Sequence, residues 1–312
     1  MLKNKPLISF IIPVYNSSQY INKVVQSILN QQYPADRLEI ILIDDHSKDD
    51  SLKKLQLLES NNPRSINVIA HQINKGLSSA RNTGINNARG DILVFLDSDI
   101  SLEQDFIPQV LKRFKDDKIK GIVGKTLPGK DVNYDKFQKY LYEARRGARN
   151  LSSCGNVPYH HFLYNITAVR KGVVMETGEF DPGITKYGGE DTEYAYRMAQ
   201  KYPEGLYCCP NIKGYHHHYR SLEDAIKLYR IYGRDNVPYI INKHPSMKPI
   251  YYFDYLEGPF YKRMIGKIIK TKRCRKLLKL TFKIIPAPFY FVLVKLLLAS
   301  ALLEGIDSSE KI

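Results

Sequence analysis

The stretch Ile92-Leu93-Val94-Phe95-Leu96-Asp97-Ser98-Asp99 runs from five apolar residues directly into two carboxylates. The apolar residues predict a buried strand, which Asp97 and Asp99 follow at the point where it leaves the sheet. Alternate side chains of an extended chain point the same way, so both carboxylates can face one point. Two such anions repel each other unless a cation or a polyol lies between them. Because Mg²⁺ and Mn²⁺ bind carboxylates together with phosphate oxygens, the stretch predicts a metal-assisted site for a phosphorylated ligand.

Strand and helix patterns alternate through the first hundred residues. Strands are expected at 8–14, 39–43, 68–70 and 92–96, and helices between them at 21–29, 51–58 and 76–88. This order predicts an α/β fold with an open, mostly parallel sheet and helices on both faces. Ligands of such sheets bind outside the carboxyl ends of the strands. Asn16, Asp45 and the pair Asp97 and Asp99 all follow strand ends, so we expect them to share one rim.

No dinucleotide fingerprint follows the first strand and no Walker A sequence occurs, so a nucleotide would be bound by carboxylates and loop backbone. Four motifs follow one another along the chain: Ile12-Pro13-Val14-Tyr15-Asn16, Ile43-Asp44-Asp45-His46-Ser47, Gly76-Leu77-Ser78-Ser79-Ala80-Arg81-Asn82-Thr83-Gly84 and Phe95-Leu96-Asp97-Ser98-Asp99. In this order they resemble the motifs of the family 2 glycosyltransferases of the GT-A fold. The resemblance covers residues 6–125 closely and resumes at 187–198.

The resemblance implies a nucleotide-sugar donor, usually a uridine or related diphosphate sugar. By it, Asp45 and Asp97 hold the base and the ribose, Asp99 reaches an Mg²⁺ or Mn²⁺ ion on the diphosphate, and Arg81 lies near the base or the phosphates. Such an ion stabilises the charge on the leaving diphosphate without a proton. Other residues of these motifs are also expected to bind the donor: Pro13, Tyr15, Asn16 and Ser98.

The run Gly188-Gly189-Glu190-Asp191 precedes a mainly amphipathic helix. Acids in a first helical turn often serve only the helix dipole, but this run resembles the acceptor-side motif of the same family. By that match Asp191 is the general base, Glu190 orients the acceptor and Gly189 lets the loop bend close to the substrate. A base opposite the leaving group gives single displacement with inversion at the anomeric carbon.

The cluster Tyr215-His216-His217-His218-Tyr219 offers a further metal ligand. In a strand, His216 and His218 share one face. A histidine in this region often completes the metal shell in related GT-A enzymes, so either is a candidate beside Asp99. A hydrogen-bonded surface or acceptor-site histidine is the alternative, and the spacing does not choose between the two residues.

Two other segments match no motif. Tyr232-Gly233-Arg234 would approach the diphosphate or an anionic lipid head group, or is a plain helix end. The segment 130–158 suggests an acceptor surface, because aromatic faces stack on sugars and arginines bind phosphates; an amphipathic helix with a solvated basic face is the alternative. Its residues of interest are Tyr134, Tyr140, Tyr142, Arg145, Arg146 and Arg149.

The net charge of +15 is concentrated in 262–283, which carries 10 Lys and Arg residues and no acidic residue. The following stretch, 284–303, is almost entirely apolar apart from Pro286, Pro288, Lys295 and Ser300. It is just long enough to cross a bilayer, and an interfacial segment beside the basic run fits as well. A helical hairpin packed on the protein's own core is the alternative. We expect contact with anionic lipids on the cytoplasmic side, and no nucleic acid.

Residues 1–6 contain no apolar segment, so no secretory signal is expected. The four cysteines, Cys154, Cys208, Cys209 and Cys274, show no C-x-x-C spacing. Neither a zinc site nor a disulfide is expected, and the thiols are interpreted as reduced packing residues.

Together these patterns predict an inverting, metal-dependent glycosyltransferase that acts on a saccharide or lipid-linked saccharide in surface glycan synthesis. Residues 1–125 and 126–245 form the donor and acceptor halves of one domain, and 246–312 the membrane-associating region. One alternative is a phosphotransferase of the haloacid dehalogenase type, but its Asp-x-Asp motif normally opens the domain, whereas three strand–helix units come first here. Another is a non-catalytic nucleotide-sugar or glycan-binding protein, which the intact set of Asp97, Asp99 and Asp191 disfavours.

Overall fold

The computed structural model describes residues 5–144 and 151–309. Its contacts divide the chain into two compact units. The sheet unit comprises 1–132, 145–183 and 190–218, and the helical unit comprises 133–144, 184–189 and 219–312. These boundaries differ from the predicted ones at 125 and 245. The sheet unit contains the donor half and most of the acceptor half, whereas three acceptor-half segments, 133–144, 184–189 and 219–245, belong to the helical unit with the C-terminal region.

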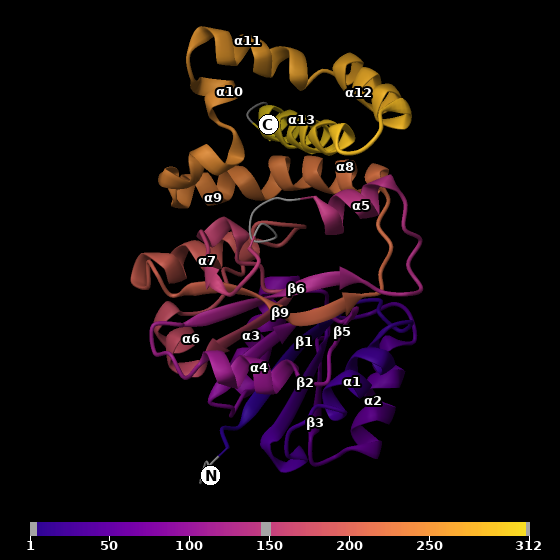
Figure 1. The fold of residues 1–312 in the computed structure, drawn as a ribbon, viewed down its shortest axis with the longest axis vertical. Helices are drawn as coiled ribbons and strands as arrows, with labels where there is room; N and C mark the ends of the chain where they lie inside the picture. Colours follow the sequence, from indigo (N-terminus) through magenta and orange to yellow (C-terminus); the bar gives the residue numbers. More distant parts are fainter. Residues whose placement is uncertain (1–4, 145–150, 310–312) are drawn as a thin grey trace. The chain divides into compact units, whose positions relative to one another are not determined.

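In the described part of the sheet unit, nine strands form one sheet in the order β3-β2-β1-β4-β8-β6-β9-β5, with β7 paired to β9 (Figure 1). The first four predicted strands are confirmed to within two residues, and they pair in parallel: β1 (Ile8–Val14), β2 (Leu38–Asp44), β3 (Ile66–Ala70) and β4 (Ile92–Leu96). The second half is mixed. There β8 (Ile166–Arg170) runs antiparallel to both β4 and β6 (Gly121–Pro128), and β9 (Leu206–His216) runs parallel to β6. Two short strands, β5 (Ile100–Leu102) and β7 (Gly155–Asn156), pair antiparallel with β9.

Helices cover both faces of this sheet, as predicted. Alternate residues of β1 enter different cores: Phe10 packs in a cluster with α1 (Ile21–Leu29), α2 (Ser51–Asn61) and α4 (Phe106–Arg113). Ile11 packs in the other cluster, with α3 (Leu77–Asn87), α6 (Lys171–Thr177) and α7 (Glu190–Lys201). A Cβ atom on Gly84 of α3 would overlap the Ile11 side chain. This close approach fixes α3 against β1. Short 3₁₀ turns lie at η1 (Ala35–Arg37) and η3 (Tyr159–His161).

The helical unit is built around α13 (Phe289–Ser309), whose Val294, Leu297 and Ala301 are fully buried. They pack in one cluster with residues of α5 (Lys136–Glu143) and α8 (Leu222–Ile231). The remaining helical segments are η4 (Tyr232–Asn236), α9 (Val237–Lys243), η5 (Pro245–Tyr251), α10 (Asp254–Glu257), α11 (Phe260–Ile269) and α12 (Lys272–Ile284).

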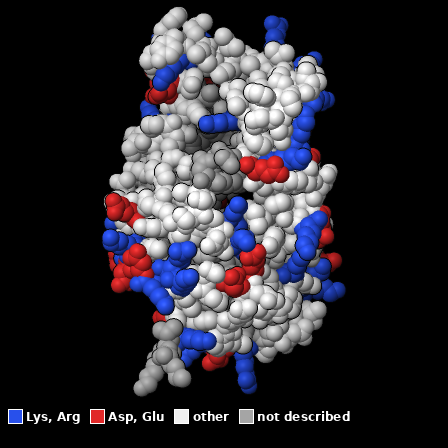
Figure 2. All heavy atoms as spheres, viewed as in Figure 1, with Lys and Arg blue, Asp and Glu red and all other residues white. Residues whose placement is uncertain are grey.

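The helix α13 is long and apolar enough to cross a membrane, yet 56% of its most apolar window is buried inside the protein. It contains most of the apolar stretch predicted for membrane contact. The predicted basic run lies mainly on α11 and α12. In Figure 2, lysine and arginine atoms project near the top of the view, where Figure 1 places these two helices.

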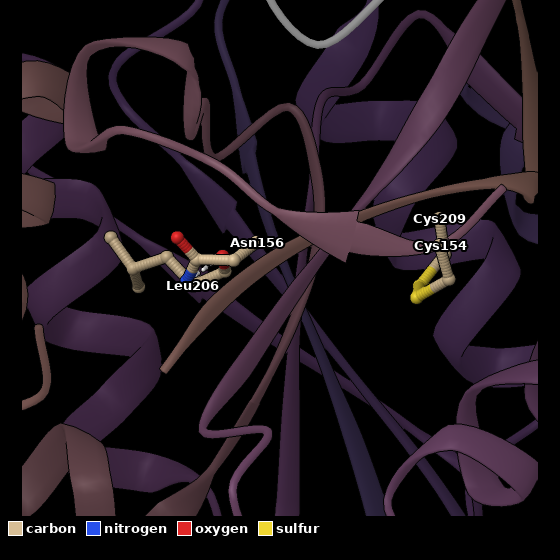
Figure 3. The surroundings of a disulfide bond; sticks show 4 residues. All are labelled: Cys154, Asn156, Leu206 and Cys209. Carbon is tan, nitrogen blue, oxygen red and sulfur yellow. Dashed lines mark hydrogen bonds between the residues drawn. A yellow bond between two sulfur atoms is a disulfide. The ribbon is translucent and has the colours of Figure 1, made fainter. Parts of the chain in front are cut away.

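The expectation of four reduced thiols is wrong for Cys154 and Cys209, which form a disulfide (Figure 3). The residues are 55 positions apart, and the pairing of β7 with β9 brings their Cα atoms to 4.0 Å. Beside the bond, Asn156 Nδ2 donates a hydrogen bond of 3.1 Å to the carbonyl of Leu206. The spacing of the cysteines gave no sign of this pairing, because it depends on a contact between distant strands.

Candidate active site

Asp97 and Asp99 lie in the short connection between β4 and β5. The pairing of β5 with β9 sets Ile100 opposite His216. As a result, His216 Nε2 lies 3.1 Å from Asp99 Oδ2. The ring of His218 lies 6.3 Å from that of His216 and meets Tyr20 edge-on. His216, one of the two candidate histidines, therefore lies beside Asp99.

A carboxylate and an imidazole are suitable ligands for Mn²⁺ or Mg²⁺. No group of three His, Cys, Asp or Glu side chains that could hold an ion occurs among residues 5–144 and 151–309. Asp99 and His216 would accordingly supply only part of a coordination shell. The residues fit an ion whose other ligands are diphosphate oxygens and water, as is usual for Mg²⁺ in nucleotide sites.

Asp97 remains partly open, with 37% of its side chain exposed. Desolvation and the charge of Asp99 raise the pKa of Asp97 to about 7, although Arg81 opposes the shift. Burial and the neighbouring charge of Asp99 thus both disfavour the ionised form of Asp97. A cation beside the two carboxylates would oppose this effect.

Arg81 of α3 is the centre of the site, with 2% of its side chain exposed. Its Nη1 donates a 2.6 Å hydrogen bond to Asp191 Oδ1, and the same atom lies 3.6 Å from Glu190 Oε1. Its Nη2 lies 3.8 Å from Asp97 Oδ1. The guanidinium also covers the ring of Phe180 at 5.1 Å. Burial alone would lower the pKa of Arg81, but these three carboxylates raise it.

Asp191 and Glu190 occupy the first turn of α7. The second oxygen of Asp191, Oδ2, accepts a 3.1 Å hydrogen bond from the backbone N–H of Tyr164. Asp191 is thereby held from two sides, by Arg81 and by Tyr164. Burial and the charge of Asp191 raise the pKa of Glu190 to about 7, with Arg81 opposing. The structure brings Asp97 and Asp191, which are predicted to bind the donor and the acceptor, to the guanidinium of Arg81.

Asp45 is buried at the end of β2 and organises the loop before α3. Its Oδ1 lies 2.7 Å from His71 Nδ1 and accepts a 2.8 Å hydrogen bond from Lys75 N. Its Oδ2 accepts a 2.8 Å bond from Gly76 N, whose φ of 85° is in the left-handed region. His71 was not predicted. It ends β3 at the same rim, so the strand-end rule could have found it.

The remaining rim residues connect the motifs to one another. Asn16 N donates to Ser47 Oγ at 3.0 Å, and Asn16 Oδ1 accepts from Lys48 N at 2.7 Å. Ser98 Oγ lies 2.7 Å from Ser17 Oγ. Tyr15 is exposed, and Pro13 of β1 is half-buried.

Gly189 belongs to the helical unit, where its φ is 99° and a Cβ would overlap Ile240 and Tyr232. Asn236 Nδ2 donates a 2.7 Å hydrogen bond to the carbonyl of Gly188 and so holds this bend. Arg234 is paired with its neighbour Asp235 at 2.6 Å.

The suggestion of an aromatic acceptor surface is wrong for Tyr140 and Tyr142, which are buried in the helical unit because the apolar face of α5 packs inward. Tyr134 is exposed at the start of this segment and donates a hydrogen bond to Glu143. The predicted Arg145, Arg146 and Arg149 lie outside the described residues.

Similarities to known proteins identify the family of this chain. The model of "Glycosyl transferase family 2" matches residues 9–178. The chain is 26% identical over 317 residues to an uncharacterized glycosyltransferase of Bacillus subtilis, YfnE, covering 84% of this chain and 76% of that protein. It is 27% identical over 247 residues to the minor teichoic acid biosynthesis protein GgaA of Bacillus subtilis, covering 76% of this chain and 52% of GgaA.

The fold is also shared with a solved structure, the mannosyltransferase PcManGT from Pyrobaculum calidifontis in complex with GDP-Man and Mn²⁺. The TM-score is 0.65 at 17% identity, covering 96% of this chain and 87% of the other. The expected GT-A architecture is thereby confirmed. The family model matches more than half of the residues, and the chain therefore belongs to glycosyl transferase family 2 and is a glycosyltransferase.

Proposed function

We propose that this enzyme transfers a sugar, with inversion, from a nucleotide diphosphate sugar to a hydroxyl group of a saccharide or lipid-linked saccharide. The observation that carries the proposal is the position of Arg81 between Asp97 and Asp191. This proximity supports the proposal, in which Asp97 binds the donor and Asp191 is the base. Both motifs lie in the sheet unit.

The donor is proposed to be a uridine diphosphate sugar, with Asp45 at the base and Asp97 at the ribose. Asp45 Oδ1 is already engaged by His71 Nδ1 and Lys75 N, whereas Oδ2 accepts from Gly76 N and has a second lone pair for a ligand. Asp97 is exposed enough to accept bonds from a ribose diol. PcManGT binds GDP-Man, so guanosine donors are the natural comparison.

We assign Asp99 and His216 as the protein ligands of a divalent ion, Mg²⁺ or Mn²⁺. When bound, the ion would stabilise negative charge on the departing diphosphate. The support is the 3.1 Å approach of the two side chains and the raised pKa of neighbouring Asp97. PcManGT is in complex with Mn²⁺.

Asp191 is proposed to take the proton from the acceptor hydroxyl as its oxygen attacks the anomeric carbon. The bond from that carbon to the diphosphate oxygen breaks in the same step, which inverts the configuration. Arg81 and Tyr164 N hold the carboxylate in one orientation and leave a lone pair on each oxygen available. Glu190, with a pKa of about 7, is partly protonated near neutral pH and can donate a hydrogen bond to the acceptor.

We further propose that the enzyme works at the cytoplasmic face of a membrane in surface glycan synthesis. Support comes from the basic run at 262–283 and the apolar α13. The relative GgaA is named a minor teichoic acid biosynthesis protein.

The test is a panel of UDP- and GDP-sugars incubated with the purified enzyme with and without Mn²⁺. We expect one donor to raise the melting temperature and to be consumed in an Mn²⁺-dependent way. Asp99→Ala should lose the metal dependence, whereas the exposed control Asp36→Asn should behave as wild type. If no nucleotide sugar stabilises the protein, the donor assignment fails. Binding of a donor without turnover, with acceptors present, would instead indicate the non-catalytic alternative. The family assignment leaves the phosphotransferase alternative without support.

A further inference from the structure

We propose that the outer surface of α11 and α12 lies flat on an anionic lipid bilayer, and that α13 supports this surface without crossing the membrane. The inference rests on the membrane location proposed above and specifies the residues that make the contact. All of these residues belong to the helical unit.

Both helices expose large apolar side chains in helical stripes. On α11, Phe260 and Ile268 are 71% and 59% exposed, and Met264 lies between them at the same four-residue spacing. Tyr261 and Ile265 widen this stripe. On α12 the exposed stripe is Leu277, Leu280 and Ile284, with Ile284 at 82%. Single exposed apolar residues are ordinary, but two neighbouring stripes of this size mark an interaction surface.

The charges around these stripes fall into two groups. Four basic side chains are used within the protein: Lys262 with Asp254, Lys270 with Asp307, Arg275 with Glu304, and Lys279 with Glu223. The other six have no carboxylate within ion-pair distance among the residues that the structure describes: Arg263, Lys267, Lys272, Arg273, Lys276 and Lys283. A surface of unpaired cations around exposed apolar side chains complements anionic head groups and the acyl region beneath them.

Internal contacts hold the two helices as a platform on α13. Arg275 of α12 pairs with Glu304 of α13 at 2.8 Å, and Ser300 Oγ donates a 2.7 Å bond to the carbonyl of Ile269. A Cβ on Gly266 would overlap the backbone of Tyr255, so α11 is also packed closely from within. In Figure 1, α11 and α12 lie on the side of α13 away from α8.

The helix α13 is the less suitable membrane element. Its Val294, Leu297 and Ala301 are fully buried against α5 and α8. Insertion of α13 into lipid would expose the core of the helical unit. Nucleic acid is a poorer occupant of the α11–α12 surface than lipid, because a phosphate backbone leaves the apolar stripes in water.

The experiment is flotation of the full chain with vesicles of phosphatidylcholine alone or of equal parts phosphatidylcholine and phosphatidylglycerol. We expect binding to the mixed vesicles, weakened by salt, and roughly tenfold less binding to neutral ones. An apolar variant with Phe260→Ser, Ile268→Ser and Leu277→Ser should lose binding roughly tenfold, and a charge variant with Lys267→Glu, Lys272→Glu and Lys276→Glu should do the same. The matched control is Leu57→Ser with Met175→Ser, two similarly exposed apolar residues of the sheet unit.

Several outcomes would overturn the inference. Unchanged flotation of both variants would show that this surface does not bind lipid. Resistance of the bound protein to alkaline carbonate extraction would show that the chain is inserted in the bilayer. A wild-type dimer that binds no vesicles and becomes monomeric in the variants on gel filtration would show that the surface joins two copies of the chain. Tighter binding to duplex DNA than to mixed vesicles would also overturn the inference. Nucleotide-sugar consumption in detergent, measured on the same variants, should stay at the wild-type level. If neither the wild type nor any variant consumes a nucleotide sugar, the proposed function is rejected. The flotation experiment would still test the membrane surface by itself.

Discussion

Arg81 Nη1 and Asp191 Oδ1 lie 2.6 Å apart, so a buried cation of α3 holds a carboxylate in the first turn of α7. The same guanidinium reaches Glu190 and Asp97. We therefore propose that Arg81 is a positioning residue, which fixes the proposed base Asp191 relative to Asp97. The fork of N–H donors on Arg81 is what allows one side chain to reach all of these carboxylates.

Arg81→Lys keeps the positive charge but removes this fork. We expect kcat to fall by roughly 100-fold with a smaller change in KM for the donor, because Asp191 loses its orientation. The free energy of unfolding should fall by about 3 kcal/mol, since buried carboxylates lose their partner. Steady-state kinetics and urea unfolding measure the two effects. Arg89→Lys, at an exposed arginine paired with Glu39, is the control. Equal kcat in wild type and Arg81→Lys would show that the ion pairs are only structural.

A metal titration should distinguish the contributions of His216 and His218 to metal binding. In His216→Ala we expect the affinity for Mn²⁺ to fall by about tenfold or more, because this imidazole lies beside Asp99. The affinity is measured from the thermal stabilisation by Mn²⁺ in the presence of UDP. We expect a smaller loss of metal affinity in His218→Ala, because the His218 ring lies 6.3 Å from that of His216. The reverse order of the two variants would contradict the assignment of His216.

The raised pKa of Glu190 gives a pH signature. Its carboxyl binds a proton more tightly in the folded chain than in the unfolded one, so its stabilising contribution is complete below about pH 4.5 and is lost as pH rises through about 7. The loss is roughly 3 kcal/mol for this shift. Asp191, Arg81 and Asp97 are the charged groups that face it.

Glu190→Gln removes this titration. As the pH rises from 5 to 8, we expect the free energy of unfolding of Glu190→Gln to increase relative to that of the wild type. Urea unfolding of both proteins across that range is the measurement. A difference that stays constant with pH would mean that Glu190 titrates normally.

Gly84→Ala tests the packing that places α3. A Cβ at this position overlaps the Ile11 side chain on β1. We expect a loss of about 1–3 kcal/mol in the free energy of unfolding, together with reduced turnover, because a shift of α3 also moves Arg81. Gly172→Ala is the control, since a Cβ there has nothing within 4 Å. Similar stability of the two variants would argue against a tight fit.

The sequence was sufficient where periodicity and topology decide the structure. The strands β1 to β4 and the helices α1 to α3 follow from apolar patterns, and the strand-end rule correctly put Asp45, Asp97 and Asp99 at one rim. The sequence was insufficient where contacts between distant segments determine the position of a side chain. The choice of His216 depends on the register of β5 with β9, and the role of Arg81 depends on how α3 packs beside α7.

Other contacts left no trace in the sequence. The hydrogen bond from Tyr164 to Asp191 comes from a backbone N–H, which every residue except proline possesses. The Cys154–Cys209 disulfide depends on the pairing of β7 with β9. The sequence pattern suggested that Tyr140 is a surface aromatic residue. In the structure α5 packs against α13, so Tyr140 lies in the core of the helical unit.

The most direct measurement compares Asp191→Asn with wild type and with Asp36→Asn, using the donor identified by the nucleotide-sugar panel. If Asp191 is the base, Asp191→Asn should bind donor and Mn²⁺ with unchanged affinity while kcat for transfer falls by roughly 10²–10⁴-fold. Transfer by Asp191→Asn at the rate of the other two proteins would contradict the account.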